Sequence, residues 1–147
     1  MKGEMEIQIR RLRADARIPV YRHQGDAGFD FHAAEDVTVP PNGVAILATG
    51  LAMAIPEGFE LQIRLRSGAA LNTPLILPNA PATIDSGYRG ELGIIVRNLS
   101  DKPFLVKKGD RIAQGILARV WQARFQETDS LPESDRGAGG YGSTGSR

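Results

Sequence analysis

The chain has 147 residues, of which 41% are hydrophobic and 24% are charged, a composition typical of one soluble globular domain with a modest core. Its formal net charge of +1 is too small to favour a nucleic-acid or membrane surface, and the absence of cysteine excludes disulfides, thiolate metal sites and a cysteine nucleophile. Because no apolar stretch resembles a signal peptide or a membrane span, we expect a cytoplasmic protein with neither nucleic acid nor membrane as partner.

Most of the chain shows the period-two alternation of β-strands. Residues 59–66 (FELQIRLR) are the clearest example, because every second side chain from Phe59 to Leu65 is apolar, as a half-buried strand requires. Turn-forming sequences such as PPNG and SDKP separate the other short candidates. In chain order these candidate strands are residues 5–12, 36–40, 43–55, 91–99 and 104–110. Short strands at short intervals predict an all-β domain, either a closed barrel or a sandwich.

Residues 111–121 (RIAQGILARVW) allow two interpretations. Ile112, Ile116 and Val120 follow a helical spacing, which favours a helix. Gly115 lies in the middle of this segment, however, and would cost a helix about 1 kcal/mol. We therefore predict a further strand here.

The sequence favours only one helix, a short one at about residues 67–71. Beyond residue 126 the chain becomes polar and then rich in glycine, so it has nothing to bury. We therefore expect a β-rich core domain at residues 1–126 and a mobile linker and arm at residues 127–147. The arm nevertheless carries a guanidinium, an aromatic ring and two hydroxyls, from Arg136, Tyr141, Ser143 and Thr144.

Two segments in the first half of the chain carry charged groups that could bind a ligand. Residues 26–36 (DAGFDFHAAED) contain four carboxylates, and residue type alone favours a turn with solvated acids. In residues 64–70 (RLRSGAA) a strand end meets the expected helix. At this junction Arg66, Ser67 and Gly68 could offer a guanidinium, a hydroxyl and free N–H groups to an oxyanion.

Residues 79–98 (NAPATIDSGYRGELGIIVRN) combine turn-forming and functional residue types. Ser86 and Gly87 predict a tight hairpin connection with Gly87 at positive φ, which would present backbone donors and acceptors. Asp85 and Tyr88 stand beside this turn. Asp85 could equally cap the turn, and Tyr88 could cover the core, so residue type alone leaves their roles open.

Five segments in chain order resemble the five motifs of the trimeric dUTPases, the deoxyuridine triphosphatases. These segments are DAGFDFHAAED, RSGAA, NAPATIDSGYRGE, GDRIAQ and RGAGGYGSTG, and the resemblance extends from Asp26 to Gly145. Five motifs in order, with TID before YRGE and a terminal GSTG, make it highly specific. The resemblance implies a homotrimer of jelly-roll-like subunits that share their sites. It also implies hydrolysis of dUTP to dUMP and pyrophosphate with Mg²⁺, which keeps dUTP low and supplies dUMP for thymidylate synthesis.

The resemblance implies a role for each matching core residue. Asp85 would deprotonate the water that attacks the α-phosphorus. Asp30 would hold Mg²⁺ through water, with the ion bound mainly by the triphosphate. Asn79 and the hairpin backbone would recognise uracil, while Tyr88 would pack under the deoxyribose. The phosphates would contact four residues, namely Arg66, Ser67, Gly68 and Gln114.

The resemblance also explains why a glycine-rich arm carries functional side chains. The arm of one subunit would close over a nucleotide bound by its neighbours. Tyr141, at a position where Phe is commoner, would stack on uracil, while Arg136, Ser143 and Thr144 would grip the terminal phosphates. Glycine would let the arm approach the phosphates closely.

Two other classes of function fit parts of this pattern. A dCTP deaminase or a bifunctional relative shares the fold, but it needs a general acid and base suited to attack at C4 of cytosine. A catalytically idle nucleotide-binding or signalling trimer would also keep the fold, although the intact Asp30 and Asp85 favour an enzyme. Ammonia release from dCTP and turnover of dUTP separate these alternatives.

Overall fold

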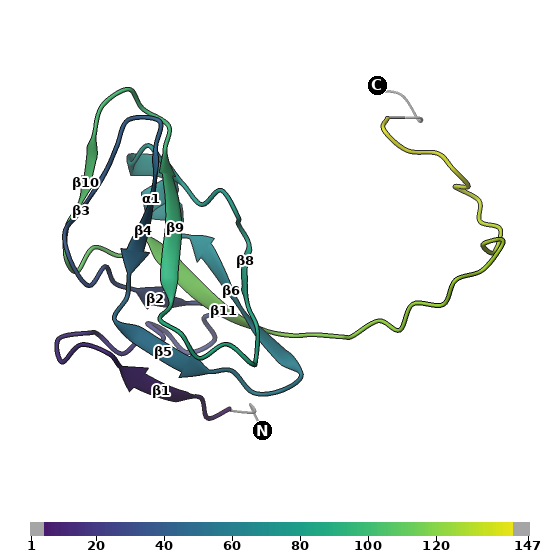
Figure 1. Cartoon of the computed structure of the whole chain (residues 1–147), viewed down its shortest axis with the longest axis horizontal. Coiled ribbons are helices and arrows are strands. Elements are labelled where there is room, and N and C mark those ends of the chain that lie inside the picture. Colours follow the sequence, from purple (N-terminus) through teal and green to yellow (C-terminus); the bar gives the residue numbers. More distant parts are fainter. Residues whose placement is uncertain (1–4, 143–147) are drawn as a thin grey trace.

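The structure is a computed structural model that describes residues 5–142, which form eleven β-strands and one short helix (Figure 1). The predicted all-β class is therefore confirmed. The elements are β1 (Gln8–Arg11), β2 (Phe29–Phe31), β3 (Val37–Val39), β4 (Val44–Ala48), β5 (Leu51–Ala54), β6 (Phe59–Leu65), α1 (Ser67–Asn72), β7 (Leu75–Ile76), β8 (Ala82–Ile84), β9 (Gly93–Asn98), β10 (Phe104–Val106) and β11 (Ala113–Arg119).

The strands of this part of the chain form four antiparallel sheets. The largest has the strand order β2-β11-β6-β8, and a three-stranded sheet has the order β4-β9-β7. β1 pairs with β5, and β3 pairs with β10. Side chains of both larger sheets, including Phe31 and Leu61 from one and Leu47 and Val96 from the other, belong to one buried core. The arrangement is thus an open, jelly-roll-like sandwich, and none of the four sheets in residues 5–142 closes on itself as a barrel.

Residues 111–121 contain a strand, as predicted, and Gly115 is the reason that β11 fits its neighbours. A side-chain Cβ at Gly115 would lie 2.7 Å from ring carbons of both Phe29 and Phe31, which is closer than packed atoms allow. Glycine lets the two rings of β2 pack directly on the β11 backbone. This close packing, rather than helical spacing, decides the conformation.

The expected strand at residues 43–55 is divided into β4 and β5 by a turn at Thr49 and Gly50. Gly50 has a φ of 70°, and a Cβ there would lie 2.8 Å from the Cβ of Ala16. Only glycine combines this backbone conformation with so little space. The division lets β4 pair with β9 while β5 pairs with β1.

Two short strands differ from the sequence-based expectation. β2 lies within the acidic segment at residues 26–36, which residue type favoured as a turn, because Phe29 and Phe31 both face the core. β7 contains only Leu75 and Ile76, too few residues to show an alternation. The predicted helix at residues 67–71 is confirmed as α1.

The predicted tight hairpin at Ser86 and Gly87 is wrong. The N–H of Tyr88 donates to the carbonyl of Asp85 at 3.1 Å, so a turn is present. Gly87, however, does not have a positive φ, and the strands on either side do not pair with each other. β8 pairs with β6, and β9 pairs with β4 and β7, so the connection crosses from one sheet to another.

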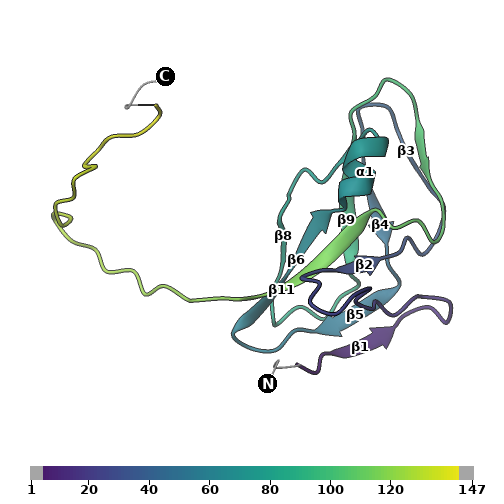
Figure 2. The same cartoon turned by 180° about the vertical axis from the view of Figure 1, so that it is seen from behind.

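After β11 the chain leaves the body of the molecule as an extended segment (Figures 1 and 2). Trp121 and Phe125 are both 94% exposed, and residues 121–142 contain neither helix nor strand. No helix of the described chain combines the length and the apolar character needed to cross a membrane.

Candidate functional site

The carboxylate of Asp30 lies between two guanidinium groups. Its Oδ1 is 2.8 Å from Nε of Arg66, and its Oδ2 is 3.0 Å from Nη1 of Arg111. Arg66 also donates from Nη1 to the carbonyl oxygen of Arg111 at 3.1 Å. The side chain of Asp30 is only 15% exposed, so these contacts are partly shielded from solvent. With two cations for one anion, this cluster keeps a net positive charge that suits a phosphate group.

Gln114 completes this cluster from the neighbouring strand. It is the direct cross-strand partner of Asp30 in the pairing of β11 with β2, and its Nε2 donates to the carbonyl oxygen of Leu65 at 3.3 Å. A Cβ at Gly28 would lie 2.6 Å from Oε1 of Gln114. Glycine at this position of the DAGFDF segment therefore leaves room for the amide of Gln114.

Ser67 and Gly68 follow Arg66 at the start of α1 and are both exposed. A Cβ at Gly68 would meet no atom within 4 Å, so the space in front of this helix start is open. The structure therefore brings together five residues that the sequence analysis singled out. These are Asp30, Arg66, Ser67, Gly68 and Gln114, which we call the Asp30 cluster together with Arg111.

Arg111 is a residue that the sequence analysis missed. Its signal was present, because it stands in the GDRIAQ segment three residues before Gln114.

His32, two residues after Asp30, was also missed: its Nδ1 is buried and has no hydrogen-bond partner in the described chain. Burial is the main cause that lowers the pKa of His32 below 6.5, and the charges of Arg17 and Arg111 act in the same direction. The imidazole is therefore predominantly neutral near pH 7.

The loop after β8 carries Asp85, whose exposed carboxylate has no hydrogen bond or ion pair within residues 5–142. Hydrogen bonds within the loop hold its backbone around Asp85. The Tyr88 hydroxyl donates to the carbonyl oxygen of Glu91 at 2.9 Å. Nη1 of Arg89 donates to the carbonyl oxygens of Ser86, at 2.5 Å, and Tyr88, at 2.9 Å. A general base needs a carboxylate that is free to accept a proton and is held in position. Asp85, without a partner in the described chain and on a loop fixed by hydrogen bonds, has this arrangement.

Asn79 and the arm make few contacts. Asn79 is exposed in the connection between β7 and β8. Arg136 donates from Nε to the carbonyl oxygen of Gly139 at 2.8 Å, and Tyr141 is fully exposed. Ser143 and Thr144 lie outside the described residues. The structure thus brings neither Asn79 nor residues 127–142 of the arm to the Asp30 cluster.

Asp85 and Asp30 lie far apart in one chain. β2 and β8 form opposite edges of the four-stranded sheet, three strand spacings or roughly 14 Å apart. Gln114, opposite Asp30, pairs with Arg64, whereas Asp85 follows Ile84, which pairs with Leu61. The two carboxylates are therefore also offset by about four residues along β6, roughly 13 Å.

Potential metal ligands are sparse within residues 5–142. No group of three or more histidine, cysteine, aspartate or glutamate side chains gathers within residues 5–142 in a way that could hold a metal ion. Asp30 is a single carboxylate whose oxygens also accept from guanidinium groups. Such a carboxylate fits an ion that keeps its waters and binds mainly to phosphate oxygens, because each oxygen retains a further lone pair for a metal-bound water.

The fold and the Asp30 cluster together define an all-β protein with a candidate site for an anion. A sequence profile of the dUTPase family matches residues 14–145, which include all five motif segments. The chain therefore belongs to the dUTPase family.

Curated relatives match almost the whole chain. The deoxyuridine 5'-triphosphate nucleotidohydrolase of Helicobacter pylori (strain P12) is 47% identical over 141 residues, which cover 96% of this chain and 97% of the relative. The enzyme of the same name from Wolinella succinogenes is 49% identical over 142 residues, which cover 97% of this chain and 95% of the relative. The similarity therefore includes the core and the arm.

Solved structures confirm the fold. A mutant dUTPase of Staphylococcus bacteriophage 80alpha with dUpNHpp superposes with a TM-score of 0.88 at 28% identity, and the match covers 95% of this chain and 98% of the phage chain. A mutant dUTPase from phage phi11 of S. aureus, whose structure concerns the coordination of a structural Mg(II) ion, has a TM-score of 0.78 at 29% identity. That match covers 86% of this chain and 99% of the phage chain.

Proposed function

We propose that this chain hydrolyses dUTP to dUMP and pyrophosphate, with Asp85 as the general base for the water that attacks the α-phosphorus. The observation that carries this assignment is the contrast between the two candidate carboxylates. Asp30 is bound by two guanidinium groups. Asp85, by contrast, is exposed and has no partner within residues 5–142, and hydrogen bonds within its loop hold the backbone around it. A carboxylate without a partner in the described chain can serve as the base once the substrate and its attacking water come within reach.

The Asp30 cluster binds the triphosphate. Arg66 and Arg111 supply positive charge, while the hydroxyl of Ser67, the open backbone at Gly68 and the amide of Gln114 supply hydrogen bonds to phosphate oxygens. Asp30 would hold a Mg²⁺ ion through water, since a single carboxylate suits an ion that keeps its waters and binds mainly to phosphate oxygens. When bound, the ion would neutralise charge on the phosphates. The protein's own residues orient the triphosphate.

Asn79 and the loop at residues 85–91 recognise the nucleoside. Backbone N–H and C=O groups and the Asn79 amide can match the edge of uracil, which has N3–H as donor and O4 as acceptor. Cytosine presents a donor where uracil has O4, so it would leave buried polar groups unpaired. The ring of Tyr88, held by its hydroxyl on Glu91, packs under the deoxyribose and leaves no space for a 2'-hydroxyl.

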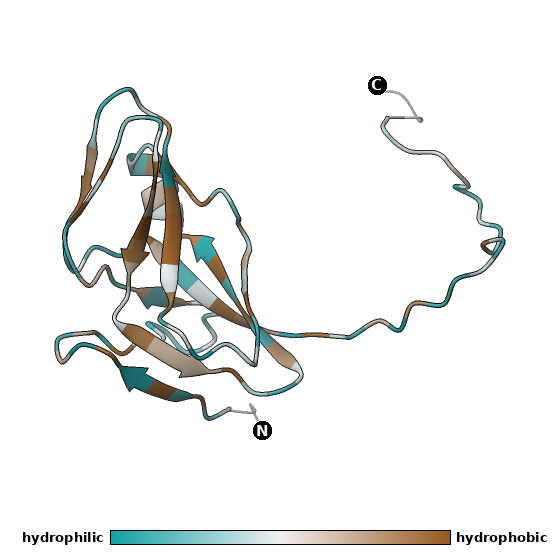
Figure 3. Cartoon of the chain, in the orientation of Figure 1, coloured by the Kyte–Doolittle hydropathy of each residue, from teal (hydrophilic) through white to brown (hydrophobic). Residues whose placement is uncertain are grey.

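The functional unit is a homotrimer whose subunits share each site. Two features support this proposal. The separation of Asp85 from the Asp30 cluster means that one chain cannot bring both to the same α-phosphate. The outer face of the β4-β9-β7 sheet also carries an apolar patch beside Arg97: Figure 3 shows β4 and the middle of β9 as hydrophobic, and Val44 and Ile46 are 55% and 64% exposed. An apolar patch of this kind is typical of a subunit interface.

The assembly can be tested directly. Light scattering after size-exclusion chromatography should give three times the chain mass of 15.9 kDa. Replacing Ile46 with Glu would place a charge in the buried interface and should dissociate the trimer, whereas the same change at exposed Leu131 of the linker should not. A monomer in the unchanged protein would refute the shared-site proposal.

The arm completes the site of a neighbouring subunit. Its Tyr141 ring is free to stack on uracil, and Arg136, Ser143 and Thr144 supply a cation and hydroxyls for the terminal phosphates. The boundary between a core at residues 1–126 and an arm at residues 127–147 is part of this proposal. So is a cytoplasmic location, where deoxynucleoside triphosphates are made and used.

One assay separates the candidate functions. Pyrophosphate release should be measured for dUTP, dCTP, dTTP and UTP, with ammonia release measured for dCTP in parallel. We expect pyrophosphate from dUTP alone. Ammonia from dCTP would indicate a deaminase or a bifunctional relative, and binding of dUTP without turnover would indicate an idle nucleotide-binding protein.

A further inference from the structure

We infer that Glu91 is a positioning residue, whose carboxylate holds the Asp85 loop in its working geometry by accepting a hydrogen bond from the Gly50 N–H. The inference rests on the proposed role of Asp85 as general base. It concerns the side chain of Glu91, which is assigned neither to the base nor to a substrate contact. Oε1 of Glu91 lies 2.8 Å from the nitrogen of Gly50, which connects β4 and β5, and neither of these strands belongs to the sheet of β8, the strand that leads into the loop.

The loop is anchored at both ends. At its start, β8 pairs with β6, with Ile84 opposite Leu61. At its end, Leu92 donates its N–H to the carbonyl oxygen of Leu51 at 2.8 Å and accepts from the Thr49 hydroxyl at 2.7 Å. Glu91 stands just before this second anchor. The hydrogen bond from the Gly50 N–H to the Glu91 carboxylate therefore fixes the last residue of the loop before this second anchor.

Gly50 is a rigid point of attachment. It is buried, its φ is 70°, and a Cβ there would lie 2.8 Å from Ala16 and 3.4 Å from Cδ of Arg13. The Glu91 carboxylate is the partner of its N–H within residues 5–142. Removing that carboxylate would leave a buried donor unsatisfied, so the local structure would shift to restore a partner.

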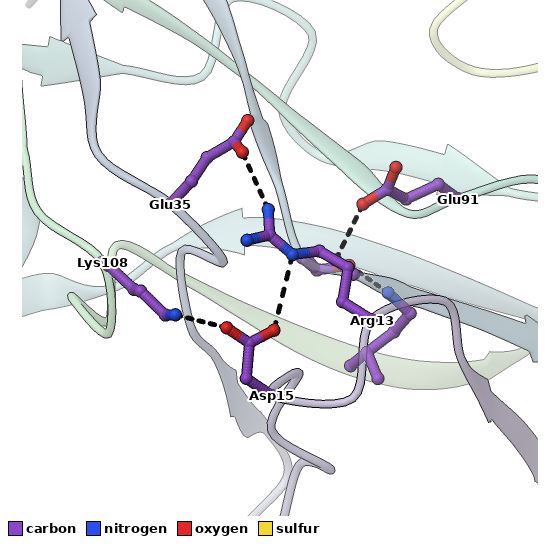
Figure 4. Close-up of polar contacts among 8 residues, drawn as sticks. Arg13, Asp15, Glu35, Glu91 and Lys108 are labelled. Carbon is purple, nitrogen blue, oxygen red and sulfur yellow. Dashed lines mark hydrogen bonds and ion pairs between the residues drawn. The ribbon is translucent and has the colours of Figure 1, made fainter.

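Figure 4 shows the ion pairs that hold the side chain of Arg13, whose Cδ lies against Gly50. Nη1 of Arg13 lies 2.7 Å from Oε2 of Glu35, and its Nε lies 3.4 Å from Oδ1 of Asp15, which also binds Lys108. Each of these pairs is partly exposed, so each contributes little stability by itself. Together they fix the Arg13 side chain that lies against Gly50. This contact helps to keep the Gly50 N–H pointing toward the Glu91 carboxylate.

Glu91 is also the point where the internal bracing of the loop meets its external anchor. Its carbonyl oxygen accepts from the Tyr88 hydroxyl, and its carboxylate accepts from Gly50. A displacement of Glu91 would therefore move Tyr88 and, through the turn from Asp85 to Tyr88, the proposed base. A misplacement of about 1 Å can lower the rate of a chemical step by about 100-fold.

The test compares Glu91→Ala, Glu91→Gln and Glu91→Asp in the full-length protein, with Glu57→Ala as the matched control on an exposed turn. We expect kcat for dUTP to fall by about 10- to 100-fold in Glu91→Ala while KM changes less than threefold. Glu91→Gln keeps an acceptor of the same reach and should retain kcat within about threefold. Glu91→Asp keeps the charge but is too short, so it should resemble Glu91→Ala.

Local amide hydrogen exchange distinguishes a displaced loop from a general loss of stability, and the pH dependence of kcat distinguishes a displaced base from an altered one. The acid limb of the pH profile should keep its position in every variant, because the base is unchanged. Exchange in residues 85–92 should speed up in Glu91→Ala and Glu91→Asp at temperatures well below unfolding. If Glu91→Ala fails to fold, the comparison of Glu91→Gln with Glu91→Asp still decides.

Three outcomes would overturn the inference. These are an unchanged kcat in folded Glu91→Ala, an equal loss in Glu91→Gln and Glu91→Asp, and an acid limb that shifts in the variants. Failure of the proposed function is a separate result, since it would appear as no dUTP turnover in the unchanged protein.

Discussion

The roles of individual carboxylates in this protein follow from their nearest neighbours. Asp30 and Asp85 have the same chemistry, but Asp30 accepts from Arg66 and Arg111, and Asp85 is bare. Both oxygens of Asp30 are already engaged by guanidinium groups, which holds this carboxylate in the cluster. The bare carboxylate is therefore the one suited to activate water.

Replacing Asp85 with Asn tests this assignment. The amide keeps the size and most hydrogen bonding of the carboxylate but cannot accept the proton, so turnover of dUTP should fall by roughly 10²- to 10⁴-fold. Affinity for a non-hydrolysable dUTP analogue, measured by calorimetry, should stay within a few-fold. Near-normal turnover in this variant would place the base elsewhere.

The ion pair of Asp15 and Lys108 predicts a pH-dependent contribution to stability. The hydrogen bond from Lys108 is the main cause that lowers the pKa of Asp15 below 3.8, and the charges of Lys108 and Arg13 act in the same direction. Because the unfolded chain takes up this proton first as the pH falls, the stabilisation is present above pH 3.8 and is lost as the pH falls through the pKa of the folded state.

Lys108→Gln should therefore raise the pKa of Asp15 toward 3.8, as followed by NMR titration of its carboxyl group. The melting temperature of the variant should lie slightly below that of the unchanged protein at pH 6, and the difference should disappear at the lowest pH. A difference of equal size at pH 2 would mean that Lys108 acts through its aliphatic stem instead.

Elements with a strong local pattern could be predicted from the sequence, and those decided by distant partners could not. β6 was predictable because Leu61 and Ile63 alternate with polar residues, and β11 because Gly115 opposes a helix. β2 was missed because two Phe residues within an acidic segment show too short an alternation. The hairpin prediction failed because turn chemistry at Ser86 and Gly87 does not determine which sheet each flanking strand joins.

The candidate site divides in the same way. Motif residues such as Arg66 and Gln114 could be selected from the sequence, since their residue types suit phosphate binding. The pairing of Asp30 with Arg66 and Arg111 could not, because it depends on β2, β6 and β11 lying side by side. The contact of Glu91 with Gly50 is similarly invisible, since it joins positions 41 residues apart.

The packing of β11 against β2 predicts a specific sensitivity at Gly115. Gly115→Ala would force a methyl group within 2.7 Å of both Phe29 and Phe31, so the free energy of unfolding should fall by about 1–3 kcal/mol. Gly68→Ala is the matched control, because the space there is open and alanine favours a helix; it should leave stability unchanged or raise it by up to about 1 kcal/mol. Chemical denaturation measures both, and equal stability in the two variants would contradict the packing argument.

The complete molecule separates what stabilises the fold from what binds the nucleotide. The core is one cluster of buried side chains from the sheets, and no residue after β11 belongs to it within the described chain. The arm contains its own short-range hydrogen bonds, such as that from Arg136 to Gly139. Its contribution should therefore appear in catalysis rather than in the stability of the unliganded protein.

Deleting residues 136–147 tests this separation. Because the arm buries no core, the melting temperature without nucleotide should correspond to a stability change within about 0.5 kcal/mol. Turnover of dUTP should fall far more than affinity, since the closed arm would align the triphosphate, exclude water and place Arg136 where charge develops. Tyr141→Ala should show a milder loss, while Tyr141→Phe, which keeps the stacking face, should be nearly silent. Intact turnover after truncation would make the arm a linker, and melting of the unliganded protein would make it part of the fold.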